Sequence, residues 1–279
     1  MKATIQFIEK ELDGLYPSIE IQGFIRLIFE NVCQLSYTDL VLRKNDRINS
    51  LAKEQIQIII KRLKKFEPIQ YILGETEFVG LKITVNPAVL IPRPETEELV
   101  DWIIRLADLK SPGILDIGTG SGCIALAIKS QMQAANISAI DISEEALIVA
   151  KQNAIQNKLE VDFFLADILT WEDKKWGDFD VIVSNPPYVR EMEKKKMHTN
   201  VLGFEPAKAL FVPDSDPLIF YQRISEFAIK YLKKGGWLFF EINENLGKEM
   251  IQLIQNLGFK NIQIRKDING KNRMLCGNK

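Results

Sequence analysis

The chain has 279 residues, 46% of them apolar, and its 36 basic and 37 acidic side chains leave a net charge of −1. This length allows one large domain, or a small domain followed by a medium-sized one. The near balance of charge argues against a broadly basic surface, and therefore against DNA or RNA as the main substrate.

The cysteines and the lengths of the apolar runs limit the possible metal sites and membrane segments. Cys33, Cys123 and Cys276 are far apart and form no metal-binding pattern, so we expect buried free thiols. The N-terminus lacks the apolar core of a signal sequence, and no run reaches the roughly 18 apolar residues of a membrane span. We therefore predict a cytoplasmic protein that binds no metal and does not enter a membrane.

Residues 3–66 have the apolar spacing of amphipathic helices. Intervals of three and four separate the first apolar residues: Ile5, Ile8 and Leu12. Asn49 and Ser50 then introduce a helix whose inner face is apolar: Ile56, Ile59, Ile60 and Leu63. These patterns predict a helical N-terminal domain over residues 1–68.

The period of the pattern changes after this domain. Over residues 69–86 the apolar period shifts toward two, with Gly74 and Gly80 as turns, which predicts a β-hairpin linker. The proline-rich segment 86–94 then leads into a helix expected over residues 95–109, whose first turn is acidic and suits the helix dipole.

A glycine-rich turn follows the first buried strand, residues 113–117. The turn consists of Gly118, Thr119, Gly120, Ser121 and Gly122. Alternate glycines allow a tight turn and a close approach to a ligand, and the helix expected over residues 123–128 would offer its N-terminal amides. Because Cys123 follows the last glycine directly, the turn departs from the dinucleotide-binding pattern, and a plain strand-to-helix connector is the alternative.

Two acidic residues follow the next strands. Asp141 ends the strand 137–140, where a carboxylate can accept both hydroxyls of a ribose; the alternative is an N-cap for the helix that begins near Ser143. Asp167 follows a strand over residues 161–165 and can accept from an adenine amino group. A solvated loop acid is the alternative interpretation of Asp167.

The strand 179–184 leads into Asn185, Pro186, Pro187 and Tyr188. The two prolines prevent further strand pairing and fix the direction of the chain. Asn185 then offers an amide acceptor and amide donors on a backbone that moves little, an arrangement that suits the gripping of a planar NH2 group. A rigid turn after a strand, with Tyr188 as a half-buried aromatic residue, is the alternative.

The rest of the chain alternates helices and strands, which predicts a mainly parallel sheet covered on both faces. A long connection over residues 189–217 contains three consecutive lysines and His198, for which we find no catalytic or ligand role. The last helix is expected over residues 246–257, followed by a terminal hairpin with strands near 262–264 and 274–276.

This order of strands, glycine loop, acids and Asn-Pro-Pro-Tyr resembles the S-adenosylmethionine-dependent methyltransferases that modify a planar amide or amino nitrogen. Three further segments narrow the resemblance: Glu67–Gly74 (EPIQYILG), Leu90–Glu97 (LIPRPETE) and Gly203–Leu210 (GFEPAKAL). Together they resemble the HemK/PrmC family, the protein-(glutamine-N5) methyltransferases of peptide chain release factors. The likeness runs from about Glu67 to the C-terminus.

The resemblance implies an α/β fold: a Rossmann-like, class I methyltransferase domain over residues 87–279, with a seven-stranded, mainly parallel sheet and an antiparallel last strand. It implies S-adenosyl-L-methionine as cofactor and S-adenosyl-L-homocysteine as product. The implied cofactor residues are Gly118, Thr119, Gly120, Ser121, Gly122, Asp141, Asp167, Ile168 through its backbone, and Asn185. The implied catalytic and substrate-binding residues are Asn185, Pro186, Pro187 and Tyr188.

The substrate that the resemblance implies is the glutamine of the Gly-Gly-Gln motif in release factors, with residues 1–68 docking the body of that protein. A monomer without nucleic acid is expected. One alternative is an adenine-N6 methyltransferase acting on DNA or RNA, which needs a basic groove that this sequence lacks in obvious form. Another is a nonenzymatic nucleoside-binding protein, against which the intact Asn185 and both loop prolines argue.

Overall fold

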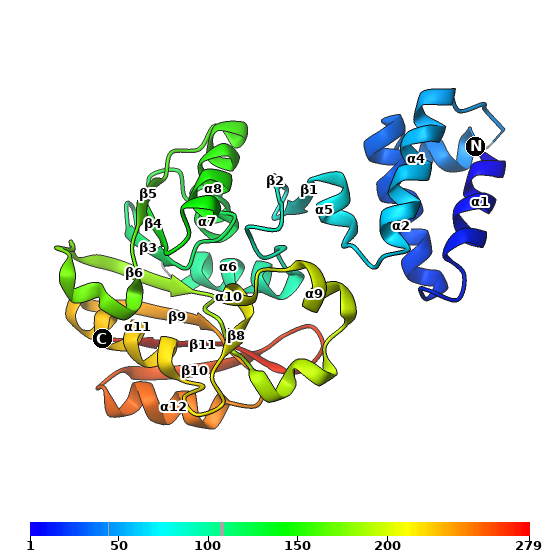
Figure 1. Ribbon diagram of the computed structural model, residues 1–279. Helices are drawn as coiled ribbons and strands as arrows, with labels where there is room; N and C mark the ends of the chain where they lie inside the picture. The colour runs from blue at the N-terminus through cyan, green and yellow to red at the C-terminus, as the bar shows by residue number, and fades with distance from the viewer. Residues whose placement is uncertain (44, 107–108) are drawn as a thin grey trace. The chain divides into compact units, whose positions relative to one another are not determined.

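The computed structural model describes residues 1–43, 45–106 and 109–279 (Figure 1). These residues form two compact units. The first contains residues 1–74 and 198–204, and the second contains residues 75–197 and 205–279. Within the described ranges, no helix is both long enough and apolar enough to cross a membrane.

The first unit is helical, as its apolar spacing predicts. Its elements are α1(Lys2–Leu12), α2(Ser18–Cys33), α3(Tyr37–Leu42), α4(Ser50–Leu63), α5(Ile69–Leu73) and α9(Thr199–Phe204). Asn49 caps α4 by accepting the Ala52 amide proton at 2.7 Å, and the predicted inner face of α4 is buried in the core of the unit. The Tyr16 hydroxyl donates to the Leu63 carbonyl at 2.7 Å and fastens the end of α4 to the turn after α1.

The predicted hairpin is present but shorter than expected. Residues 69–73 form helix α5, which ends at Gly74 in the left-handed conformation (φ 80°), so the expectation of extended structure from residue 69 was wrong. Five residues that begin after a proline carry too little periodicity to separate a helical turn from a strand. The strands are β1(Glu75–Phe78) and β2(Leu81–Thr84), with Gly80 at φ 74° in the turn as predicted.

Asn153 binds this hairpin to the second unit. Its buried side chain accepts the Thr84 amide proton at 2.7 Å and donates to the Thr84 carbonyl at 3.0 Å. It also donates to the Ser121 carbonyl of the glycine loop at 2.9 Å. The hairpin is therefore part of the second unit rather than a free connector.

The second unit is built on a sheet of seven strands from the described residues, in the order β10-β11-β9-β6-β3-β4-β5. Their bounds are β3(Gly113–Ile117), β4(Asn136–Asp141), β5(Asp162–Leu165), β6(Phe179–Ser184), β9(Leu232–Glu241), β10(Lys260–Lys266) and β11(Asn272–Asn278). Strand β11 runs antiparallel to β9 and β10, and every other neighbouring pair is parallel. The predicted mainly parallel sheet with an antiparallel last strand is confirmed.

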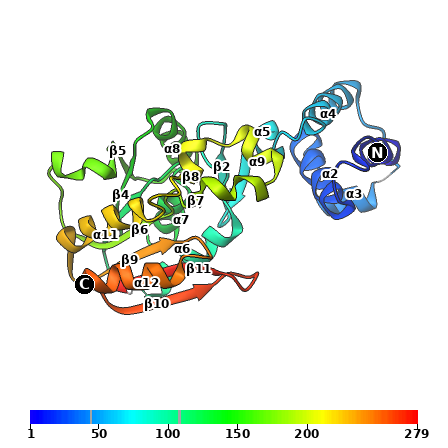
Figure 2. The same ribbon diagram turned by 60° about the horizontal axis from the view of Figure 1, so that its bottom comes forward.

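Helices cover both faces of this sheet (Figures 1 and 2). The longer ones are α6(Pro94–Leu106), α7(Cys123–Gln131), α8(Glu144–Asn157), α11(Ile219–Tyr231) and α12(Gly247–Asn256). On one face, α11 and α12 pack on apolar side chains such as Ile182 and Phe240. On the other, Trp102 of α6 meets Phe239 edge to face, with ring centroids 5.5 Å apart. The expected end of α6 at residue 109 was wrong, because Leu109 is not helical; α6 is described as far as Leu106, and residues 107–108 lie outside the described part of the chain.

The long connection after β6 consists of short elements. These are β7(Val189–Arg190), the 3₁₀ helix η2(Glu191–Lys196), α9, α10(Ala207–Leu210) and β8(Phe211–Val212); a further 3₁₀ helix, η1(Ile168–Asp173), follows β5.

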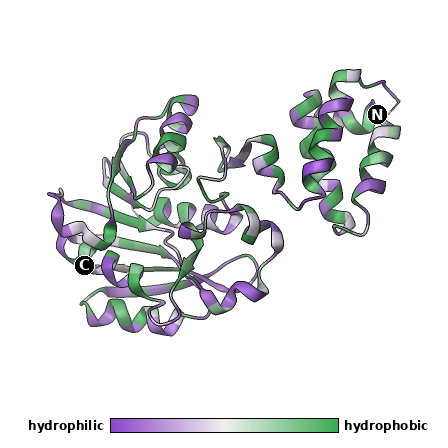
Figure 3. Cartoon of the chain, viewed as in Figure 1, coloured by the Kyte–Doolittle hydropathy of each residue, from purple (hydrophilic) through white to green (hydrophobic). Residues whose placement is uncertain are grey.

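The central strands of the seven-stranded sheet are coloured mostly as hydrophobic in Figure 3, in keeping with their burial on both faces.

Asn153→Ala should lower the free energy of unfolding by about 2–4 kcal/mol, because it leaves backbone groups of Thr84 and Ser121 without partners. Chemical denaturation measures this change. Gln156→Ala is the matched control, because Gln156 binds the same strand from an exposed position at 3.1–3.2 Å. Its cost should stay below about 1 kcal/mol. Equal losses in the two variants would contradict the anchoring role of Asn153.

Candidate active site

The predicted site residues meet where the order of the strands reverses. Strand β3 pairs with β4 on one side and with β6 on the other, with Ile117 opposite both Ile140 and Ser184. The connections after these three strands therefore leave the sheet at the same edge, side by side (Figure 1). In open α/β sheets, the crevice at such a reversal is the usual place for a ligand.

The glycine loop leaves open space at this edge. Gly118 and Gly120 have φ values of 73° and 53°, and a Cβ added to either would meet no atom within 4 Å. Gly122 differs, because an added Cβ would lie 3.2 Å from the Ala150 Cβ. The first two glycines thus border free space above the strand ends, while the third permits close packing of α7 on α8.

Asp141 accepts a hydrogen bond from the backbone of the glycine loop. Its Oδ2 accepts the Gly120 amide proton at 2.8 Å, and its Oδ1 accepts the Ser143 amide proton at 2.9 Å. The alternative of Asp141 as the helix cap was wrong, because Ser143 itself caps α8 by accepting from the Ala146 amide. Burial raises the pKa of the Asp141 carboxyl, and its backbone hydrogen bonds act against this rise.

Asp167 and Ile168 stand at the end of β5. Asp167 caps η1, with its Oδ1 accepting the Leu169 amide proton at 2.8 Å. The Ile168 side chain is buried in the apolar core of the second unit, so only its backbone is free to serve a ligand.

The Asn-Pro-Pro-Tyr turn follows β6. The Asn185 Nδ2 atom donates to Thr96 Oγ1 at 3.4 Å, whereas Asn185 Oδ1 accepts no hydrogen bond from the described residues. Pro186 is buried and Pro187 is half-buried. The Tyr188 hydroxyl donates to Glu241 Oε1 at 2.9 Å, so its polar end is held within the protein, and burial raises the pKa of this phenol.

Two acids that the sequence analysis did not single out also belong to this edge. Glu241 ends β9, is 2% exposed, and accepts the Thr96 hydroxyl proton at 2.6 Å as well as that of Tyr188. Asp116 lies in β3 and is fully buried, and its Oδ2 accepts the Thr119 hydroxyl proton at 2.6 Å. The signal in both cases is a carboxylate inside an otherwise apolar strand, which is costly to bury and therefore points to a functional role.

Asp116 provides a test of whether a cofactor fits. No described residue donates a hydrogen bond to its Oδ1, although the atom is buried under the glycine loop. Burial raises the pKa of this carboxyl from 3.8 to about 7, against the hydrogen bonds from the Thr119 hydroxyl and the Ala125 backbone amide. This buried carboxylate is joined through Thr119 to the loop in which Gly118 and Gly120 leave open space, which suits a ligand that carries an ammonium group and hydroxyls, as S-adenosylmethionine does.

Two of the three segments that narrowed the family resemblance are joined here. The Arg93 guanidinium forms an ion pair with Glu205, whose side chain is only 1% exposed, and the Ile91 amide donates to the same carboxylate at 3.3 Å. The Leu90–Glu97 segment and Glu205 of the GFEPAKAL segment thus form one wall beside the turn that contains Asn185.

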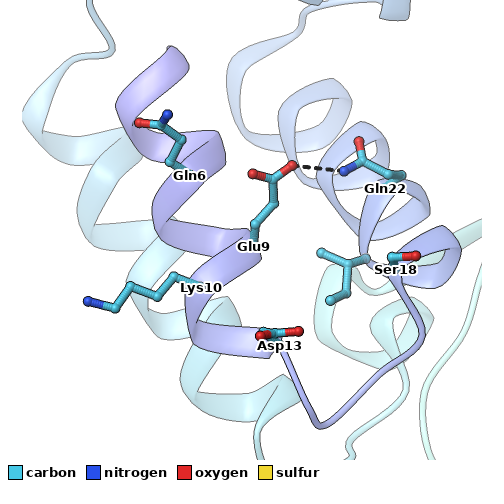
Figure 4. A pocket seen from close by; sticks show the side chains of 7 residues that line it. Gln6, Glu9, Lys10, Asp13, Ser18 and Gln22 are labelled. Atoms are coloured by element: carbon cyan, nitrogen blue, oxygen red, sulfur yellow. Dashed lines mark hydrogen bonds between the residues drawn. The ribbon is translucent and has the colours of Figure 1, made fainter.

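Three other features of the described residues, namely possible metal ligands, His198 and a surface hollow, add no candidate catalytic group. Within the described ranges, no three His, Cys, Asp or Glu side chains are grouped so as to hold a metal ion, and His198 is exposed. An open hollow of about 570 Å³ lies between α1 and α2 in the first unit. Its lining is mostly polar, and Gln22 donates to Glu9 at 2.9 Å across it (Figure 4). This hollow contains none of the predicted site residues.

Comparison with known proteins agrees with this geometry. Residues 12–74 match the PrmC N-terminal domain, and residues 102–215 match the methyltransferase small domain. A release factor glutamine methyltransferase from Flavobacterium psychrophilum is 47% identical over 97% of this chain and 95% of its own length. The enzyme of the same name from Bacteroides thetaiotaomicron is 42% identical over the full length of both chains.

The chain belongs to the release factor glutamine methyltransferase family. Solved structures confirm the class I methyltransferase fold. A methyltransferase from Pyrococcus furiosus aligns with a TM-score of 0.55 over 72% of this chain and 89% of its own, at 21% identity. A 16S rRNA N2 G1207 methyltransferase from Thermus thermophilus, solved with AdoMet and guanosine, aligns with a TM-score of 0.53 over 74% of this chain and 49% of its own, at 19% identity.

The buried carboxyl of Asp116 makes stability depend on pH. Because its pKa is raised in the folded state, its contribution is fully present below the unfolded pKa of 3.8 and is lost as the pH rises through about 7. Without ligand, wild type should therefore lose stability relative to Asp116→Asn by up to about 1.4 kcal/mol per pH unit in this window. Denaturation at a series of pH values measures the difference. The exposed Asp162→Asn is the control, and an equal pH trend in both variants would contradict the assignment.

Proposed function

We propose that this protein transfers a methyl group from S-adenosyl-L-methionine to the side-chain amide nitrogen (N5) of the glutamine in the Gly-Gly-Gln motif of peptide chain release factors. The product of the cofactor is S-adenosyl-L-homocysteine. Membership of the release factor glutamine methyltransferase family supports the reaction and the substrate. The observation that carries the proposal is that Asn185 Oδ1 accepts no hydrogen bond from the described residues, on a proline-stiffened turn at the edge where the glycine loop also begins.

The chemical difficulty is the acceptor. The lone pair of an amide nitrogen is delocalised into its carbonyl, so the nitrogen is a weak nucleophile. Asn185 Oδ1 and the Pro186 carbonyl each accept one N–H of the substrate amide, which fixes both protons and directs the lone pair. The same two oxygens stabilise the positive charge that develops on nitrogen, so they bind the transition state more strongly than the substrate.

The residues that would hold the cofactor come from three strand ends. Gly118, Thr119, Gly120, Ser121 and Gly122 border its methionine part and ribose, Asp141 accepts from the ribose hydroxyls, and Asp167 with the Ile168 backbone meets the adenine. Asp116, whose Oδ1 accepts no hydrogen bond from the described residues, would add negative charge next to the loop that borders the ammonium group. When bound, S-adenosylmethionine supplies an electrophilic methyl group on a sulfonium.

No general base is needed before the attack, because the amide proton becomes acidic only once the nitrogen carries the new methyl group. Pro187 shapes the turn, and Tyr188 provides an aromatic wall whose hydroxyl is held by Glu241. We place the reaction in the cytoplasm and expect a monomer without metal or nucleic acid. The net charge of −1 counts against adenine-N6 methylation of DNA or RNA.

Two variants should separate acceptor binding from cofactor binding. Asn185→Ala should abolish methyl transfer while S-adenosylmethionine still binds, because the interactions that are lost concern the acceptor nitrogen.

Asp141→Ala should lower the affinity for S-adenosylmethionine by about 10-fold or more, since one or two charge-assisted hydrogen bonds are lost. Calorimetry gives the affinities, and mass spectrometry of the release factor gives the product. If Asn185→Ala still forms a substantial amount of N5-methylated glutamine, Asn185 does not hold the substrate amide as proposed.

Residues 1–68, which make up most of the first unit, are the proposed docking domain for the release factor. The apolar core of this unit is separate from that of the second unit, so deletion of these residues leaves the sheet core complete. Deletion of residues 1–68 should markedly lower kcat/KM for intact release factor. A short Gly-Gly-Gln peptide lacks the body of the release factor that the docking domain would bind, so its slow methylation should change little.

Circular dichroism and cofactor affinity of the truncated protein are the controls for folding of the second unit. If protein and peptide lose activity in the same proportion, the first unit supports the structure and does not read the substrate.

A further inference from the structure

Thr96 lies between two polar groups of the candidate site. It stands in the first turn of α6, is 2% exposed, and its hydroxyl donates to Glu241 Oε2 at 2.6 Å. The Thr96 hydroxyl oxygen also accepts from Asn185 Nδ2 at 3.4 Å. These three residues form a continuous polar chain from the end of β9 to the Asn-Pro-Pro-Tyr turn.

The number of protons in this chain determines its direction. A threonine hydroxyl has one proton and two lone pairs. Since Thr96 gives its proton to Glu241, it faces Asn185 with lone pairs alone. The NH2 group of the Asn185 amide must therefore point toward Thr96, which leaves Oδ1 on the opposite side. The reversed amide would set Oδ1 against the lone pairs of Thr96 and would lose the hydrogen bond.

Glu241 is held as an acceptor by its other neighbours. Its second oxygen accepts the Tyr188 hydroxyl proton at 2.9 Å. Arg273 places Nη1 3.4 Å from the same tyrosine oxygen, and its positive charge favours the ionised carboxylate against the effect of burial. With a hydroxyl proton on each oxygen and a guanidinium nearby, Glu241 accepts and does not donate.

We propose that Thr96 and Glu241 are positioning residues that fix the orientation of the Asn185 amide, so that Oδ1 and not Nδ2 meets the N–H of the substrate glutamine. This inference rests on the proposed function and adds two residues to it. Neither residue touches the substrate; both act through Asn185. A free amide can turn about its last torsion and would offer the wrong group, since an NH2 donor cannot accept the substrate proton.

The experiment compares Thr96→Val, Thr96→Ser and wild type on intact release factor with S-adenosylmethionine. Valine keeps the shape but removes the hydroxyl, and should lower kcat by about 10-fold or more, since a misdirected acceptor loses transition-state stabilisation. The KM values and the cofactor affinity should stay within about 2-fold, because the change acts on the transition state. Serine keeps the hydroxyl and should restore kcat to within about 3-fold of wild type.

Ser225→Ala is the matched control. Ser225 is fully buried in the same unit, and its hydroxyl has no hydrogen-bond partner among the described residues. This variant tests the loss of a buried hydroxyl as such and should leave kcat unchanged. Unchanged kcat in folded Thr96→Val, or an equal loss in Thr96→Ser, would overturn the proposal.

Glu241→Gln is a second variant that tests the same proposal. If Thr96→Val does not fold, the result for Glu241→Gln alone decides whether the proposal holds. The Thr96 and Tyr188 hydroxyls face different oxygens of Glu241, and a glutamine would turn its NH2 group toward one of them, so that this hydroxyl would lose its acceptor. We expect a lower kcat, and no further loss when Thr96→Val is added, because both changes interrupt one chain. Multiplied losses, or full activity of Glu241→Gln, would overturn the proposal. Absence of glutamine methylation by wild type would instead remove the proposed function itself.

Discussion

The pairing of β3 with β4 on one side and β6 on the other determines where the polar groups of the site lie. It brings the ends of three parallel strands to one edge, although the residues that follow them are far apart in the sequence. Each strand end then contributes a different part of the site, since β3 leads into the glycine loop, β4 ends in Asp141, and β6 leads into the Asn-Pro-Pro-Tyr turn. A parallel sheet allows this division because its connections cross over and return to the same edge.

The site concentrates acids in a region from which water is largely excluded. Burial raises the pKa of Asp116, Asp141 and Glu241, so folding works against the ionisation of all three. The surroundings compensate in different ways. Asp141 is held by backbone amides, Glu241 by two hydroxyls and a nearby guanidinium, and Asp116 by one hydroxyl and one backbone amide, with an oxygen left over. The least compensated acid is Asp116, which is linked to the glycine loop through the Thr119 hydroxyl.

Local patterns in the sequence predict the parts of this structure that depend on neighbouring residues. The strands 113–117 and 179–184 were located to the residue, because each is an apolar run that polar or turn-forming residues delimit. Helix α5 was missed, since five residues do not establish a period. The competition between Asp141 and Ser143 for the cap of α8 could not be decided from the sequence, because both residue types cap helices well. The contact between Thr96 and Glu241 spans 145 positions, and no local pattern contains it.

Asn153 gives the glycine loop a mechanical link to a distant part of the unit. The buried Asn153 side chain forms hydrogen bonds with the Ser121 carbonyl of the glycine loop and with the Thr84 backbone of β2. A ligand that stiffens the loop must then also steady the hairpin, and by thermodynamic reciprocity a contact that steadies the hairpin tightens the grip of the loop. The hairpin, which follows residue 74 in the chain, is therefore coupled to the conformation of the glycine loop through one side chain.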